Sequence, residues 1–164
     1  MADAIKKKKM TVLIAGTAVM VAALVAAYVF FFAKANPALP RATVRIGDAA
    51  FDAEIASTMA SRARGLSYRS GLGDGQAMLF IFDRPAVQNF WMKDMNFPLD
   101  MIWIGGNTVL GFAENVVPQP GVPLWGLNIS TSPDGTDKVL EVVAGTVEKD
   151  GITIGDAVVI GQSK

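Results

Sequence analysis

Residues 10–33 form a run without a single charged side chain, made mostly of Val, Ala, Leu, Ile and Phe. As an α-helix this run would be about 36 Å long, because each residue adds about 1.5 Å. The hydrocarbon core of a bilayer is about 30 Å thick, so such a helix would cross it with some tilt. We therefore expect residues 10–33 to form a single transmembrane helix that precedes the rest of the chain.

The charges on either side of the run predict its orientation. A lysine cluster from Lys6 to Lys9 precedes the run, whereas Lys34 alone follows it closely. The more basic flank of a membrane helix stays in the cytoplasm. Residues 1–9 are thus expected to form a cytoplasmic tail. The protein would be a single-pass protein of a bacterial inner membrane, with its domain facing the periplasm or the cell exterior.

A cleaved secretory signal is the alternative, because Ala33-Lys34-Ala35 has the small-x-small form of a cleavage site. Cleavage near Ala35 would release a secreted domain. The apolar run exceeds the roughly 7–15 residues typical of a signal peptide, which favours an uncleaved anchor. Residues 34–41 contain Pro37 and Pro40, which cannot continue a helix, so we interpret them as a linker before a domain at 42–164.

The chain contains neither cysteine nor histidine. An exported domain without disulfides depends on its hydrophobic core for stability. The missing residue types exclude a thiol nucleophile, a Ser-His-Asp triad, a histidine base and an ordinary zinc site, and we expect no metal centre or cofactor. From residue 36 onward ten Lys and Arg oppose fourteen Asp and Glu, and this net charge of −4 argues against nucleic acid as a partner.

The first part of the domain predicts a hairpin and a short helix. Residues 43–46 and 51–56 alternate between apolar and polar side chains around a Gly-Asp turn, as two paired strands do. Ser57 or Thr58 is suited to cap the start of a helix that continues to Arg64, and Gly65 is suited to end it.

The remainder of the domain predicts further strands. Residues 78–82 read as a buried strand and 87–92 as its return strand. Residues 101–104 and 108–112 flank a Gly-Gly-Asn turn, and 139–144 and 157–160 complete the sheet. The proline-rich stretch 118–137 reads as a long loop of the kind that forms lids or binding loops. The expected fold class is α+β and β-dominated. It is a small antiparallel barrel or curled sheet of about seven or eight strands with one short helix.

Six blocks follow one another along the domain: Arg62-x-Arg64-Gly65-Leu66-x-x-Arg69, Met78-Leu79-Phe80-Ile81-Phe82, Phe90-Trp91-Met92-Lys93, Pro98-Leu99-Asp100, Val139-Leu140-Glu141-x-x-Ala144-Gly145 and Gly151-Ile152-x-x-Gly155-Asp156. In this order they resemble those of the DUF192 family of uncharacterised bacterial and archaeal proteins. The resemblance covers roughly residues 44–160 and implies a compact, mostly β domain, often exported, without an agreed activity. Two positions depart from the family pattern: Ala77 stands where glycine is usual, and Met95 where threonine is usual.

Two carboxylates, Asp100 and Glu141, lie in apolar strands, where each must be either paired or protonated. Together they could act as acid and base in a hydrolase or lyase. Alternatively, arginines of the short helix could pair with them and hold the helix onto the sheet, which is the interpretation we favour. We expect Lys93, both carboxylates and at least one of Arg62, Arg64 and Arg69 to form one polar cluster at the base of a pocket.

The other candidates are aromatic, basic or sulfur-containing. Arginine recognises carboxylates and phosphates with two parallel hydrogen bonds, which suits a small anionic ligand. Trp125, in the proline-rich loop, is the tryptophan least explained by core packing, and it suits stacking on a ligand. Met78, Met92, Met95 and Met101 lie close in sequence. Thioethers bind Cu(I), but gap filling in the core explains these residues better.

The sequence therefore predicts a membrane-anchored binding or accessory module of the cell envelope, with a small anionic or envelope-derived ligand. The alternatives are a hydrolase or lyase that acts on an envelope polymer through paired carboxylates, and a structural partner in an envelope complex. The expected ligand-binding residues are Arg64, Arg69, Trp91, Lys93, Asp100, Trp125 and Glu141.

Overall fold

The computed structural model describes residues 16–26, 28 and 38–162. The chain divides into two compact units, Met1–Lys34 and Ala35–Lys164. In the first unit, residues 16–26 are helical. Over the described residues, no helix combines the length and the apolar character needed to cross a bilayer. Much of the span expected at 10–33, with the basic tail before it, lies outside the described residues.

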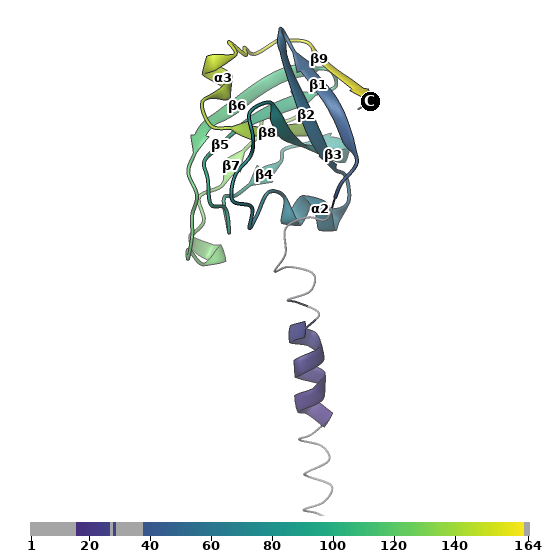
Figure 1. Cartoon of the computed structure of the whole chain (residues 1–164), viewed down its shortest axis with the longest axis vertical. Helices are drawn as coiled ribbons and strands as arrows, with labels where there is room; N and C mark the ends of the chain where they lie inside the picture. Colours follow the sequence, from purple (N-terminus) through teal and green to yellow (C-terminus); the bar gives the residue numbers. More distant parts are fainter. Residues whose placement is uncertain (1–15, 27, 29–37, 163–164) are drawn as a thin grey trace, which may run out of the picture. The chain divides into compact units, whose positions relative to one another are not determined.

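In the second unit, most of the described strands form one curled sheet (Figure 1). Seven strands form this sheet in the order β6-β5-β8-β3-β2-β1-β9, and β4 and β7 form a separate two-stranded sheet. The strands are β1 Arg41–Ile46, β2 Ala49–Ala56, β3 Gln76–Ala86, β4 Asn89–Phe90, β5 Leu99–Gly105, β6 Thr108–Val116, β7 Ser130–Thr131, β8 Thr136–Val143 and β9 Val158–Gln162. The helical segments are α2 Met59–Arg64, η1 Leu124–Gly126 and α3 Thr146–Lys149.

The expected hairpins are confirmed, but the expectation of a wholly antiparallel sheet is wrong. β1 pairs with β2 and β5 with β6, each across a short glycine-containing turn. β2 and β3, however, are parallel, with Asp52 opposite Gln76 and Ala56 opposite Phe80. The cause is the connection between them, because α2 and the loop after it carry the chain back to the end at which β2 begins.

The two edges of the sheet meet at one point, which gives it the form of a half-barrel. Thr108 at the start of β6 forms an antiparallel bridge with Ala157 beside β9. The Val109 N–H donates to the Asp156 carbonyl at 2.9 Å, and the Val158 N–H donates to the Asn107 carbonyl at 2.9 Å. These bonds satisfy backbone groups that an open edge would leave unpaired.

Other segments differ from expectation in detail. β3 continues through Pro85 to Ala86, with an irregular register after Ile81. The expected return strand at 87–92 is only the short β4, which pairs with β7 rather than with β3. The stretch expected to be a loop, 118–137, contains η1 and β7, and a second short helix, α3, stands where a single turn was expected.

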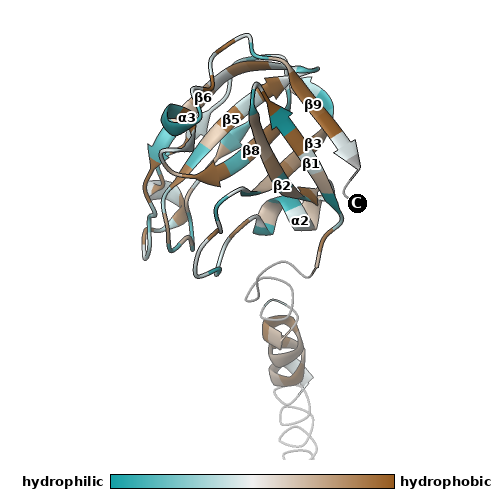
Figure 2. Ribbon diagram, turned by 45° about the horizontal axis from the view of Figure 1, so that its top comes forward, coloured by the Kyte–Doolittle hydropathy of each residue, from teal (hydrophilic) through white to brown (hydrophobic). Residues whose placement is uncertain are grey.

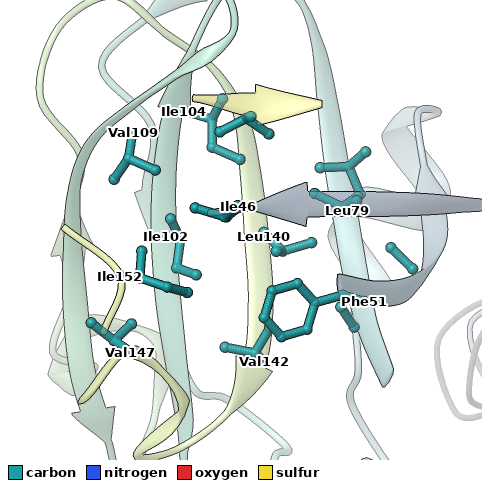
Figure 3. Packing of buried hydrophobic residues seen from close by; sticks show 14 residues of the cluster. Ile46, Phe51, Leu79, Ile102, Ile104, Val109, Leu140, Val142, Val147 and Ile152 are labelled. Atoms are coloured by element: carbon teal, nitrogen blue, oxygen red, sulfur yellow. The ribbon is translucent and has the colours of Figure 1, made fainter. Parts of the chain in front are cut away.

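Two hydrophobic clusters lie on opposite faces of β3, β5 and β8. The first fills the curl of the sheet, where side chains from both sides of the half-barrel point toward one another (Figure 3); it includes Ile46, Phe51, Leu79, Ile102 and Leu140. The second includes Leu66, Met78, Phe80, Met101 and Trp103. Figure 2 shows hydrophobic residues along much of β9 and hydrophilic residues in α3. Because β5 is covered on both faces, it is buried almost throughout.

Candidate functional site

The short helix α2 forms one wall of the site, and its N-terminus is held by reciprocal capping. The Thr58 hydroxyl accepts the Ser61 N–H at 3.1 Å, and the Ser61 hydroxyl accepts the Thr58 N–H at 3.0 Å. Two orphan donors of the first turn are thereby satisfied. This arrangement confirms the expected helix start and identifies Thr58 as the cap.

Arg62 anchors the middle of the same helix to the sheet. Its guanidinium donates to the Ser57 carbonyl at 2.6 Å and to the Ile81 carbonyl of β3 at 2.8 Å. The same group lies 5.2 Å from the centre of the Phe82 ring, within range of a cation–π contact. Arg62 therefore positions the wall of the site and does not pair with either expected carboxylate.

Gly65 ends the helix and sets how closely the next turn approaches the sheet. Its φ angle of +51° is unfavourable for residues with a side chain. A Cβ atom there would lie 3.4 Å from the Phe80 ring. The glycine thus allows the chain to turn directly over Phe80 and bury Leu66.

A pocket of about 250 Å³ lies between α2, β3, β4 and the segment that follows β4. Most of its wall is hydrophobic, which suits the apolar body of a small ligand. Phe90 packs edge-on against Phe80 at 5.0 Å between ring centres, and lies 5.7 Å from Trp103. These ring contacts fix the floor of the pocket. The hydrophobic lining residues include Met59, Leu66, Phe80, Phe82, Phe90 and Met95.

Glu141 contributes a carboxyl group to the lining of this pocket. It lies on β8 between Met101 of β5 and Met78 of β3, and only 5% of its surface is exposed. Among the described residues its carboxyl makes no hydrogen bond and no ion pair. Burial raises its pKa from 4.5 to about 8, so the carboxyl is mostly protonated at neutral pH. A neutral carboxyl can both donate and accept a hydrogen bond.

Two more expected site residues, Arg64 and Trp91, line the same pocket. Arg64 is partly exposed at the end of α2, and within the described part of the chain its guanidinium has no carboxylate partner. Trp91 is 46% exposed, so one part of the indole is open to solvent. The pocket therefore presents a free cation, an aromatic face and a neutral acid around a hydrophobic floor.

Asp100 does not share this pocket, and the expectation that it would meet Glu141 is wrong. Asp100 is opposite Val142 on β8, one residue away from Glu141, so the two side chains project from opposite faces of the sheet. Its carboxylate is fully buried and accepts the N–H groups of Asn115 at 2.7 Å and Val147 at 2.9 Å. Asp100 thus holds α3 and β6 against β5.

Arg69 and Lys93 are also placed outside the pocket lining. Arg69 donates to both carboxylate oxygens of Glu54 on β2, at 2.7 and 2.8 Å. This contact lowers the pKa of Glu54. Lys93 pairs with Asp94, which also accepts the Tyr68 hydroxyl at 2.7 Å. The expected cluster of Lys93, both carboxylates and an arginine is therefore not formed.

Trp125 lies in η1 and is 89% exposed, and it does not line the pocket. The structure thus brings together Arg64, Trp91 and Glu141, but not Arg69, Lys93, Asp100 or Trp125. Phe80, Phe90 and Met95 were not expected as pocket walls, although the density of aromatic residues at 80–91 could have indicated the two phenylalanines. The four methionines grouped in sequence are buried in the second hydrophobic cluster, as expected for gap filling.

Comparison with known proteins adds a family and two solved structures. Residues 42–160 match the sequence model of the family DUF192, described as "Uncharacterized ACR". A crystal structure from Sinorhizobium meliloti 1021, described as a "putative transcription regulator", has a TM-score of 0.68 and 29% identity, over 76% of this chain and 97% of that one. A protein of unknown function from Novosphingobium aromaticivorans DSM 12444 has a TM-score of 0.63 and 33% identity, over 73% of this chain and 83% of that one. No curated protein matches the sequence.

Proposed function

We propose that the domain of this chain, which belongs to the DUF192 family, binds a small molecule in the pocket around Glu141. The observation that carries the proposal is a buried carboxyl that opens into a cavity and has no partner among the described residues. Over the described residues no side-chain oxygen is both fully buried and without a hydrogen bond, so the Glu141 carboxyl oxygens reach the space of the pocket. A ligand there would complete the hydrogen bonds that the protein leaves unmade.

The chemistry of the lining defines the ligand class. The aromatic and aliphatic walls accept an apolar body, and the Arg64 guanidinium accepts an anionic group such as a carboxylate or phosphate. The neutral Glu141 carboxyl accepts or donates one hydrogen bond to a polar group of the ligand. We therefore infer a compact anionic molecule with an apolar or aromatic portion.

The hydrolase or lyase alternative has less support. A mechanism with paired carboxylates requires both groups at one reacting centre. Asp100 lies on the other face of the sheet and is hydrogen-bonded to backbone N–H groups. One structural relative is described as a putative transcription regulator. The net charge of −4 over residues 36–164 does not support such a role here, since DNA binding favours a basic surface.

Native mass spectrometry of the full chain, freshly purified from the envelope fraction, tests the proposal. We expect a retained small molecule on the wild-type protein. Glu141→Met, which keeps the volume but removes the polar group, and Arg64→Met should both reduce its occupancy. Arg45→Met removes an exposed arginine outside the pocket and serves as the matched control. A wild-type protein that retains nothing, or equal retention by Glu141→Met, would overturn the proposal.

We further propose that residues 10–33 anchor the protein in the inner membrane and that the domain faces the periplasm or exterior. The length of the uncharged run and the lysines before it support this orientation. Fractionation should find the full-length chain in the membrane, and protease added to spheroplasts should digest the domain. Recovery of a soluble form that begins at Asn36 would instead establish a cleaved signal and a secreted protein.

A further inference from the structure

Polar side chains of the pocket wall offer mainly hydrogen-bond donors to a ligand. The Asn89 side-chain oxygen accepts the Thr131 hydroxyl at 3.0 Å, which leaves the NH₂ group of Asn89 for a ligand. The Arg64 guanidinium, also in the wall, donates hydrogen bonds and cannot accept them. Ser67 differs, because its hydroxyl donates to the Lys93 carbonyl at 3.3 Å and so presents an acceptor. A ligand that matches most of this wall is therefore rich in acceptors.

Hydrophobic side chains surround the Glu141 carboxyl on its own sheet face. Glu141 is opposite Met78 of β3 and opposite Met101 of β5. Val139, two residues away on β8, shares the same face, and all three neighbours belong to the second hydrophobic cluster. Such surroundings disfavour the charged form of a carboxyl, which agrees with the raised pKa of Glu141.

The charged groups near the pocket do not offset this effect. Of the described residues that line the pocket, Arg62 and Arg64 on α2 are the charged ones besides Glu141, and neither forms an ion pair with it. The Arg62 guanidinium donates to two backbone carbonyls instead. In the segment after β4, Lys93 and Asp94 pair with each other. The Glu141 carboxyl therefore meets a ligand in its neutral form, with one O–H to donate.

We propose that Glu141 donates a hydrogen bond from its protonated carboxyl to an acceptor atom of the ligand, and that the ligand is released when this carboxyl ionises. This inference rests on the proposed function and narrows the ligand class to compact anions that also carry a carbonyl, ether or second acid oxygen. An ionised carboxyl has no proton to donate, and its charge would repel the anion. An ammonium group on the ligand is disfavoured, because the guanidinium groups of Arg62 and Arg64 already line the pocket.

The pH dependence of ligand retention tests this role of Glu141. The full chain, freshly purified from the envelope fraction, is dialysed at pH 6 or at pH 9.5, and native mass spectrometry measures the fraction that still carries a small molecule. We expect this fraction to be at least about fivefold lower after dialysis at pH 9.5, because affinity falls by up to about tenfold per pH unit once the carboxyl ionises. Near-UV circular dichroism at both pH values checks that the domain is folded.

Glu141→Gln is the matched variant, because glutamine keeps a donor at this position and cannot ionise. Its retention of the small molecule should be the same at pH 6 and at pH 9.5. Glu148→Gln removes an exposed carboxyl outside the pocket lining and should keep the pH dependence of the wild type.

A second measurement uses the wild type alone and does not depend on the folding of a variant. The molecule released at pH 9.5 is recovered and added back to the emptied chain at pH 8, in two buffers that differ in their enthalpy of ionisation. Calorimetry should show proton uptake on binding, because the bound ligand holds the Glu141 carboxyl in its protonated form. A heat of binding that does not depend on the buffer would overturn the proposal.

The outcomes separate a failure of the donor role from a failure of the proposed function. Wild-type retention that is equal at both pH values, or that increases with pH, would overturn the donor role and leave binding in the pocket intact. A folded Glu141→Gln chain that retains nothing at pH 6, or that loses the molecule at pH 9.5, would also overturn the donor role. A wild-type chain that retains nothing at either pH would overturn both proposals.

Discussion

Asp100 and Glu141 lie on neighbouring strands one residue out of register, and their carboxyl groups therefore project from opposite faces of the sheet. The Asp100 carboxylate is used to bind two backbone N–H groups. The Glu141 carboxyl opens into a pocket and has no partner in the described part of the chain. Similar burial thus leads to two different arrangements, a structural contact for Asp100 and an open position for Glu141 at which we propose that a ligand binds.

Asp100→Asn should destabilise the domain by about 2–3 kcal/mol without affecting ligand retention. An asparagine keeps one acceptor oxygen but places its NH₂ group against a backbone N–H, so one buried donor loses its partner. Chemical denaturation of the wild type and the variant measures the loss. Asp48→Asn, in the exposed turn between β1 and β2, is the control and should change stability by less than about 0.5 kcal/mol. Equal effects of the two substitutions would contradict the assigned role.

Glu141 should make the domain less stable as the pH rises from about 4.5 to about 8. Its pKa is raised in the folded state, so the folded chain keeps a proton that the unfolded chain releases in this range. The contribution of the protonated Glu141 to the free energy of unfolding is fully present below about pH 4.5 and is lost as the pH rises through about 8. The slope is at most about 1.4 kcal/mol per pH unit.

The comparison of wild type with Glu141→Gln isolates this effect, since glutamine cannot ionise. The variant should be more stable than the wild type at pH 8 to 9, and the difference should shrink toward pH 5. Unfolding free energies measured across this range provide the check, with the exposed Glu148→Gln as control. A stability difference that does not depend on pH would show that Glu141 does not titrate in this range.

Arg69→Lys should cost about 1–2 kcal/mol, between the values for exposed and buried ion pairs. Lysine cannot reproduce the two parallel hydrogen bonds to Glu54. Because this contact lowers the pKa of Glu54, its stabilisation is present above about pH 4.5 and is lost as the pH falls further. The difference in thermal stability between the wild type and Arg69→Lys should therefore be large at pH 7 and small at pH 3. Arg45→Lys, an exposed position on β1, should be neutral at both pH values.

Thr58→Ala should destabilise α2 by about 1 kcal/mol, because the Ser61 N–H loses its acceptor. Hydrogen exchange at the amides of α2 should accelerate more than exchange in β5. Ser57→Ala changes the neighbouring hydroxyl and leaves the capping pair intact, so it should have little effect. Similar acceleration in both variants would indicate that the cap does not control the helix.

Local features of the fold were predictable from the sequence. The hairpin of β1 and β2, the helix from Met59 to Arg64 and the hairpin of β5 and β6 depend on turn residues and on side-chain alternation within a few positions. The parallel pairing of β2 and β3 was not predictable in this way. It depends on the path of the long connection between them, which the local pattern does not encode.

The site was predictable only in part, for the same reason. Arg64, Trp91 and Glu141 were correctly placed together, whereas Arg69 and Lys93 pair with Glu54 and Asp94 instead. Several carboxylates compete for each cation, and the outcome depends on which strands become neighbours. The alternation of side chains along one strand does not predict which residue of another strand will be the partner in an ion pair.

By itself, the sequence determined the absence of thiol and imidazole chemistry, the hydrophobic run before the domain, the family and the short-range hairpins. The tertiary structure alone decided that Glu141 faces the pocket while Asp100 faces away from it. The physical reason is the period of two along a β-strand: a shift of one residue in the register of β5 against β8 would move Asp100 to the face of Glu141. That register is set by the packing of both faces of the sheet, and therefore by the whole domain at once.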